Sequence, residues 1–327
     1  MNFNTDFQFG NISGILNNSN YSDSMKMFSA ISTCDNYGIL DYSNTLRKNK
    51  LINEQCLTKI LIFTAAISLV SKKRNECVEI LNNLGAPAYE KVKGWQQSFF
   101  YSTWQLLSLQ LRVPPNFYEC SVSINDDKKI IIGDSHIFGI IPGLLSNLNY
   151  NFNYIPGFRY SLISSPQDNL KKVAFRNALA SSYEYDQVIL SIGEIDTRSL
   201  LIDLFTNKKY SIKNSNIYFK NIFLDSLSYF AKYLSKNQEL IIIIPPPPFK
   251  IIKNFDDKEK LNAILLLYNN IIEELKNILF INNIKFLEYP SGITSLDGYV
   301  DDKNLVDHAH FHQDVYMNML GFKRLLS

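Results

Sequence analysis

The sequence predicts an α/β protein in which a parallel sheet is covered by helices on both faces and is preceded by an all-α region. Two observations predict this class. After residue 128, short apolar runs alternate with amphipathic helical stretches. From residue 51 to about residue 113, apolar residues instead recur every three or four positions, as on a buried helix face. The length of 327 residues fits about two such units, at roughly 150 residues per domain.

The first unit is predicted to be a helical N-terminal domain over residues 1–122. Its first 50 residues are rich in Asn, Ser and Asp and have a weak pattern. Helices are predicted over 51–70, 75–84 and 88–111, and Gly85 and Pro87 end the second. Trp95, Phe99, Trp104 and Leu107 recur at helical spacing, which is more typical of a core than of a ligand groove. The alternative is that this region covers the site or docks a protein partner.

The second unit is predicted over residues 123–327, after Pro114 and Pro115 break the helical pattern. Strands are predicted at 129–132, 150–155, 187–192, 240–244 and 284–287. Helices are predicted at 137–148, 168–182, 217–235, 258–280 and after Gln313. Strands that are apolar throughout and are each followed by a helix indicate a parallel sheet buried on both faces. Ligands of such sheets bind beyond the carboxyl ends of the strands, so the functional residues are expected there.

Composition excludes several classes of function. The formal net charge of +2 argues against a protein built mainly to hold nucleic acid. The four cysteines form no CxxC pair and are expected to be reduced. The N-terminus has no signal-peptide pattern, and the apolar run 60–70 is shorter than the roughly 20 residues of a membrane span. We therefore expect a cytoplasmic protein with no membrane span.

The first candidate segment is Gly133-Asp134-Ser135-His136, directly after the first strand. Glycine gives the backbone freedom for a sharp turn, and a helix is expected to begin near Ile137. Ser135 would then lie at a strand end and at a helix N-terminus, where N–H groups favour a developing oxyanion. Asp and Ser are also preferred helix caps, and this alternative carries equal weight on these residues alone.

The second candidate segment follows the third strand and places charged residues after Gly193: Glu194, Asp196 and Arg198. The Arg198 guanidinium is a planar fork of donors suited to a carboxylate, a phosphate or an oxyanion. The alternative is that Glu194 or Asp196 pairs with Arg198 and only fixes the loop.

The third candidate segment is Asp307-His308-Ala309-His310-Phe311-His312, which holds three of the four histidines. An Asp three residues before a His can orient the imidazole and stabilise its protonated form. Asp307 and His310 could therefore serve Ser135 as a general base pair. In an extended segment, His308, His310 and His312 would instead share one face and could bind a metal ion.

Together these segments resemble the SGNH (GDSL-type) hydrolase superfamily over residues 127–327. The resemblance implies a flavodoxin-like three-layer α/β/α fold, Ser135 as nucleophile, and a Ser135–His310–Asp307 triad. It also implies that the Gly157 N–H helps form the oxyanion hole and that Gly193 to Asp196 is the third family block. The run Pro245 to Pro248 after the fourth strand is typical of the family as well.

The third block departs from the family pattern, because Ile195 stands where the family has an oxyanion-binding Asn. The form Gly-Glu-Ile-Asp-x-Arg resembles a divergent branch linked to surface-polysaccharide modification, and Arg198 is the inferred replacement donor. Asp134, His136 and Glu194 are expected near the substrate.

The function expected from the resemblance is ester hydrolysis or acyl transfer through Ser135, on an O-acyl group of a carbohydrate or another small molecule. No cofactor and no metal are expected. Three alternatives remain open at this point: phosphoryl-type transfer on a glycan at the same site, metal-dependent hydrolysis at the histidines, and an inactive binding or scaffold protein.

Overall fold

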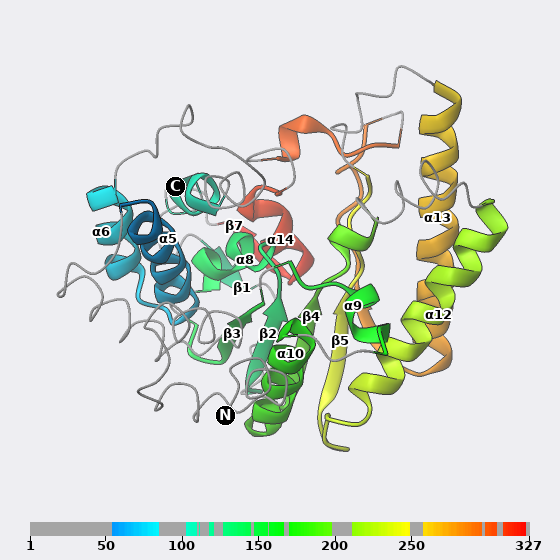
Figure 1. The fold of residues 1–327 in the computed structure, drawn as a ribbon, viewed down its shortest axis with the longest axis horizontal. Coiled ribbons are helices and arrows are strands. Elements are labelled where there is room, and N and C mark those ends of the chain that lie inside the picture. The colour runs from blue at the N-terminus through cyan, green and yellow to red at the C-terminus, as the bar shows by residue number, and fades with distance from the viewer. Residues whose placement is uncertain are drawn as a thin grey trace.

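The structure is a computed structural model. It describes residues 54–84, 103–109, 111, 118–120, 127–144, 147–155, 157–166, 170–197, 211–248, 258–295, 298–305 and 310–324. A parallel sheet lies at its centre, with helices around it (Figure 1).

The sheet has five parallel strands in the order β3-β2-β4-β5-β6. Their bounds are β2 Lys129–Gly133, β3 Tyr150–Tyr154, β4 Gln187–Ser191, β5 Glu239–Ile243 and β6 Lys285–Leu287. The chain starts at β2, moves to one edge with β3, and then crosses back to β4, which is the flavodoxin-like order. All five predicted strands are present within one or two residues, and the predicted α/β class is confirmed.

The register aligns the strand ends where the candidate segments begin. Gly133 at the end of β2 pairs with Tyr154 on one side and with Ser191 on the other. Residues that follow β2, β3 and β4 therefore emerge at the same edge of the sheet. Ile130 and Ile132 on β2 face one hydrophobic cluster, and Ile131 faces the other, as the alternation of a strand requires.

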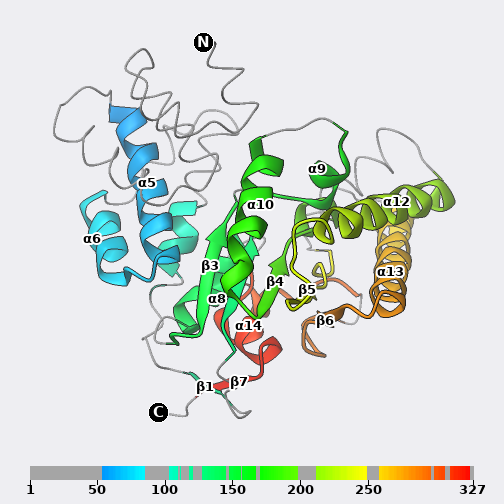
Figure 2. The same ribbon diagram turned by 90° about the horizontal axis from the view of Figure 1, so that it is seen from below.

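Helices complete a three-layer arrangement. On the Ile131 face lie α8 (Ile137–Leu144) and α14 (Gln313–Met319). The opposite face is covered by α9 (Tyr160–Ser164), α10 (Leu170–Ala180), α12 (Ile212–Phe230) and α13 (Lys258–Ile281). α12 contacts α13, and Figure 2 shows that α13 lies near β6. Short 3-10 turns cover Ser181–Glu184 and Asp302–Asn304.

Helices of the N-terminal part pack against the sheet side that carries α8. α5 (Glu54–Val70) contacts β3 and α8, and it packs on α6 (Arg74–Leu84). These two helices confirm the first two predicted ones, and the predicted helix 88–111 is helical over 103–109, whereas residue 111 lies in a turn. Most of residues 1–122 lie outside the described residues, so an all-α domain remains a prediction.

Two short strands that the sequence did not predict join distant parts of the chain. β1 (Tyr118–Cys120) pairs antiparallel with β7 (Phe322–Arg324). The predicted boundary at 122/123 therefore falls between β1 and β2, and it remains a prediction. In the described ranges, no helix has the length and apolar character that crossing a membrane requires.

Candidate active site

Ser135 and His310 are in contact at the carboxyl edge of the sheet. Nε2 of His310 lies 2.8 Å from Oγ of Ser135, although the two residues are 175 positions apart. Ser135 follows β2 by two residues and is half-buried, whereas His310 precedes α14 by three residues and is buried. The packing of α14 on α8 holds the two segments together. The predicted nucleophile and base are thus placed within hydrogen-bonding distance.

The turn that carries Ser135 requires glycine at position 133. A Cβ on Gly133 would lie 2.5 Å from the Ser191 carbonyl oxygen and 2.6 Å from Cγ2 of Ile137. The strand end can therefore approach β4 closely and then turn at once into α8. Backbone bonds from Ile137 N–H to the Asp134 carbonyl (3.2 Å) and from Phe138 N–H to the Ser135 carbonyl (3.2 Å) close the first turn.

Gly157 lies after β3, beside the strand that carries Ser135, and its φ of +60° is in the left-handed region. Among the described residues, neither the Gly157 N–H nor the Ser135 N–H donates to another protein group. An N–H group without a protein acceptor can donate to a bound ligand, which is what an oxyanion hole requires. Ile195, from the loop after β4, reaches the same place: its Cδ1 would lie 3.7 Å from a Cβ on Gly157.

The segment after β4 holds two buried acids, Glu194 and Asp196, and Asp196 anchors it. Gly193 has a φ of +102°, and a Cβ there would lie 2.6 Å from the Tyr160 ring. Asp196 accepts hydrogen bonds from the backbone N–H groups of Tyr160 (2.6 Å) and Ser161 (3.3 Å), at the start of α9. Burial raises the pKa of Asp196 to about 6. Asp196 therefore fixes the loop that follows Gly157, while Glu194 is buried and lines a pocket.

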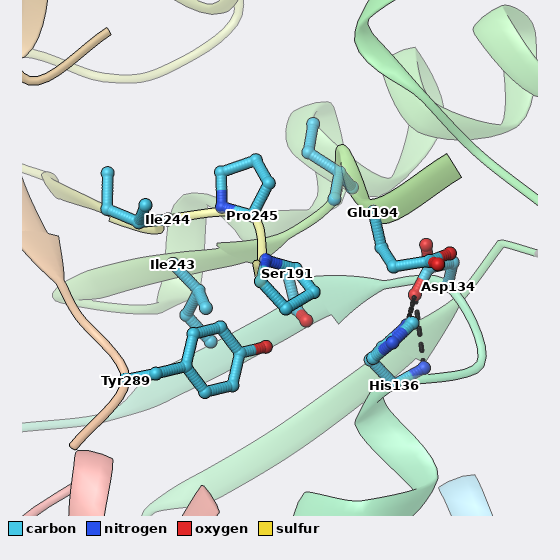
Figure 3. Close-up of a pocket in the computed structure, with 10 residues that line it drawn as sticks. Asp134, His136, Ser191, Glu194, Ile243, Ile244, Pro245 and Tyr289 are labelled. Atoms are coloured by element: carbon cyan, nitrogen blue, oxygen red, sulfur yellow. Dashed lines mark hydrogen bonds and ion pairs between the residues drawn. The ribbon is translucent and has the colours of Figure 1, made fainter. Parts of the chain in front are cut away.

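Asp134 and His136 form a buried pair next to the Ser135–His310 contact. Oδ1 of Asp134 lies 3.0 Å from Nδ1 of His136 and also accepts the His136 backbone N–H at 3.0 Å (Figure 3). Oδ2 of Asp134 is buried without a hydrogen-bond partner in the described part of the chain. The His136 and His310 ring centroids are 4.9 Å apart. The four residues thus form one contiguous polar cluster.

A pocket opens beside this cluster, between the ends of β4 and β5. Polar groups of Asp134, His136, Ser191, Glu194 and Tyr289 line it (Figure 3). Its apolar wall consists of Ile192, Ile243, Ile244, Pro245 and Pro246. Burial raises the pKa of Tyr289 well above its usual value, and the nearby Asp134 carboxylate raises it further. The space between these buried groups is about the size of one water molecule.

Sequence reasoning missed two residues of the site. Tyr289 follows β6 by two residues, so the strand-end rule that located Ser135 and Glu194 would also have found it. Lys171 lies on α10, and its Nζ donates to the Gly157 carbonyl at 3.1 Å. No motif in the sequence indicates this lysine.

Two predicted site residues lie outside the described residues: Asp307, the predicted partner of His310, and Arg198, the inferred replacement donor. His308, one of the three histidines of the metal alternative, lies outside them as well. His312 is exposed. Within the described ranges, no group of three His, Cys, Asp or Glu side chains could hold a metal ion.

Comparison with known proteins gives similarity to solved structures alone. No family model and no curated protein matches the sequence. A GDSL-like lipase from Bacteroides thetaiotaomicron is 11% identical with a TM-score of 0.39, and the alignment covers 77% of this chain and 94% of that chain. A carbohydrate acetylesterase from Sinorhizobium meliloti is 17% identical with a TM-score of 0.35, covering 59% and 95%.

An aryl esterase from M. smegmatis is 15% identical with a TM-score of 0.36, covering 59% of this chain and 94% of that chain. These solved structures are thus two esterases and a GDSL-like lipase.

Proposed function

We propose that this protein is a serine-dependent ester hydrolase or acyltransferase. One observation carries the proposal: the 2.8 Å contact between Oγ of Ser135 and Nε2 of His310. A serine hydroxyl is a weak nucleophile unless an adjacent base takes its proton, and a buried imidazole at this distance is such a base. The contact also argues against the inactive-scaffold alternative, because it keeps the serine hydroxyl and the imidazole together at the carboxyl edge of the sheet.

The proposed reaction begins when Oγ of Ser135 attacks the ester carbonyl carbon while Nε2 of His310 takes the hydroxyl proton. The carbonyl electron pair moves to the oxygen, and the N–H groups of Ser135 and Gly157 donate to the resulting oxyanion. His310 then returns its proton to the leaving alkoxide, and an acyl-enzyme remains. Water or a sugar hydroxyl then attacks the acyl carbon while His310 takes its proton. The bond between the acyl group and Oγ of Ser135 breaks, and His310 returns the proton to Oγ. Asp307 is proposed to orient His310.

The proposed substrate is an O-acyl group on a carbohydrate. Support comes from the resemblance of the segment from Gly193 to Arg198 to the branch linked to polysaccharide modification. Hydrolysis and transfer differ only in the acceptor that enters this site.

Ser135→Ala tests the proposal directly with an aryl acetate as substrate. We expect turnover to fall by at least 10³-fold, since loss of a catalytic serine leaves only the binding and oxyanion contributions. Undiminished turnover would end the proposal. An active protein that takes label only from a nucleotide-linked phosphoryl donor, and none from an acyl donor, would favour the phosphoryl-transfer alternative. Loss of activity with a chelator would favour metal-dependent hydrolysis.

A further inference from the structure

The ammonium group of Lys171 occupies a specific place between the loops that follow β3 and β4. A Cβ built on Gly157 would lie 2.9 Å from Nζ of Lys171 and 3.7 Å from Cδ1 of Ile195. Gly157 follows β3, and Ile195 follows β4. Since β2 lies between these two strands, their loops meet above the end of β2, where Ser135 emerges.

The Lys171 ammonium has N–H groups that are not used in hydrogen bonds to the described residues. Its ammonium carries three N–H groups. Among the described residues, one of them bonds to the Gly157 carbonyl oxygen at 3.1 Å, and the ammonium has no other partner. Lys171 is half-buried. Burial and, to a smaller extent, Arg159 lower the pKa of the Lys171 ammonium, and the Asp134 carboxylate opposes this shift only in part.

The proposed oxyanion site lacks the side-chain donor that the family pattern has at the position of Ile195. The Ile195 side chain offers no hydrogen-bond donor, whereas the backbone N–H groups of Ser135 and Gly157 have no protein acceptor among the described residues. We propose that Lys171 is a catalytic residue that donates a hydrogen bond from Nζ to the oxyanion formed on attack by Ser135. This inference rests on the proposed function and assigns the third oxyanion donor to α10.

The step requires no proton transfer from Lys171. As the Oγ–carbon bond forms, the carbonyl π pair moves to oxygen, and the ammonium stabilises that negative charge by a charge-assisted hydrogen bond. When the tetrahedral intermediate collapses, the C=O bond re-forms and the leaving alkoxide takes its proton from His310. Lys171 stays protonated throughout. Because the charge develops only in the transition state, its loss should lower kcat more than it raises KM.

Lys171→Met is the principal test, because it removes the charge and keeps the apolar stem. With a neutral aryl acetate we expect kcat to fall by about 10²–10³-fold, the usual loss for one oxyanion donor, with KM changed less than about three-fold. Lys171→Arg should recover at least ten-fold of that loss. Lys172→Met is the matched control, because Lys172 points elsewhere, to the Ser165 carbonyl and the Tyr229 ring. It should lower thermal stability and leave kcat within about two-fold.

A second variant gives a gain of function. Ile195→Asn in the Lys171→Met background places an amide donor next to Gly157, and we expect it to raise kcat by at least ten-fold over Lys171→Met alone. Unchanged kcat in Lys171→Met, with Ser135→Ala inactive, would overturn the assignment of Lys171 and leave the serine mechanism standing. A rise in KM with constant kcat would also overturn it, in favour of a substrate-binding lysine. Activity that does not depend on Ser135 would overturn both.

Discussion

Asp134 holds His136 at two points, with one carboxylate oxygen 3.0 Å from both the backbone N and the ring Nδ1. This fixes the imidazole in one orientation, with Nδ1 facing the acid. The fixed ring in turn packs against His310, the proposed base of Ser135. The pair Asp134–His136 thus supports the reactive pair from the side of α8.

Asp134→Asn should weaken this support. The substitution keeps the shape of the side chain and removes a buried, charge-assisted acceptor, which typically contributes about 1.5–3 kcal/mol. We expect the free energy of unfolding, measured by urea denaturation, to fall by that amount and kcat to fall as well. Asp301→Asn is the matched control, because the half-buried Asp301 also accepts a backbone N–H, that of Lys303, and it forms an ion pair with the Lys303 ammonium at 3.1 Å. If both variants lose equal stability, Asp134 has no special structural role.

Gly133→Ala should disturb the turn that presents Ser135. The new methyl group would lie 2.5 Å from the Ser191 carbonyl oxygen, and because that atom belongs to the backbone of β4, the strands must separate. Such overpacking costs about 1–3 kcal/mol or more. The control is Gly292→Ala, which has a φ of +91° but no atom within 4 Å of the new Cβ. We expect both variants to lose stability in urea, but only Gly133→Ala to lose esterase activity.

Asp196 should make stability depend on pH. Burial raises its pKa from 3.8 to about 6, so between these values the folded chain holds a proton that the unfolded chain has lost. Stability from this group is therefore present below about pH 4 and is lost as the pH rises through 6. Relative to Asp196→Asn, the wild-type free energy of unfolding should fall over this window by on the order of 2–3 kcal/mol. A constant difference between the two proteins from pH 4 to pH 7 would contradict this assignment.

The sequence predicted the sheet because its signal is local. Ile130, Ile131 and Ile132 are buried on both faces of β2, so the run is apolar without interruption. The same pattern located the strand ends, and with them Ser135 and Glu194, whereas Gly157 was identified only through the family resemblance. The contact of Ser135 with His310 joins residues 175 positions apart, and the sequence could supply it only as an expectation from residue types and resemblance.

Other features depend on tertiary contacts that leave no local pattern. β1 and β7 have three residues each, too short for a periodic signal, and they exist because they pair with each other. α9 has five residues, and its first N–H groups are bound by Asp196 from another loop. Lys171 lies near the start of a helix whose sequence has no unusual feature. Its ammonium belongs to the proposed site only because the folded chain brings it next to Gly157 and Ile195.

Intact-mass spectrometry after reaction with a serine-directed fluorophosphonate tests the central contact between Ser135 and His310 most directly. We expect one phosphonyl adduct per chain, mapped to Ser135 by peptide fragmentation, and a loss of at least 10²-fold in labelling rate in His310→Ala, because the hydroxyl then lacks its base. Labelling of Ser135 at the same rate in His310→Ala, or an adduct on a different residue, would contradict the account.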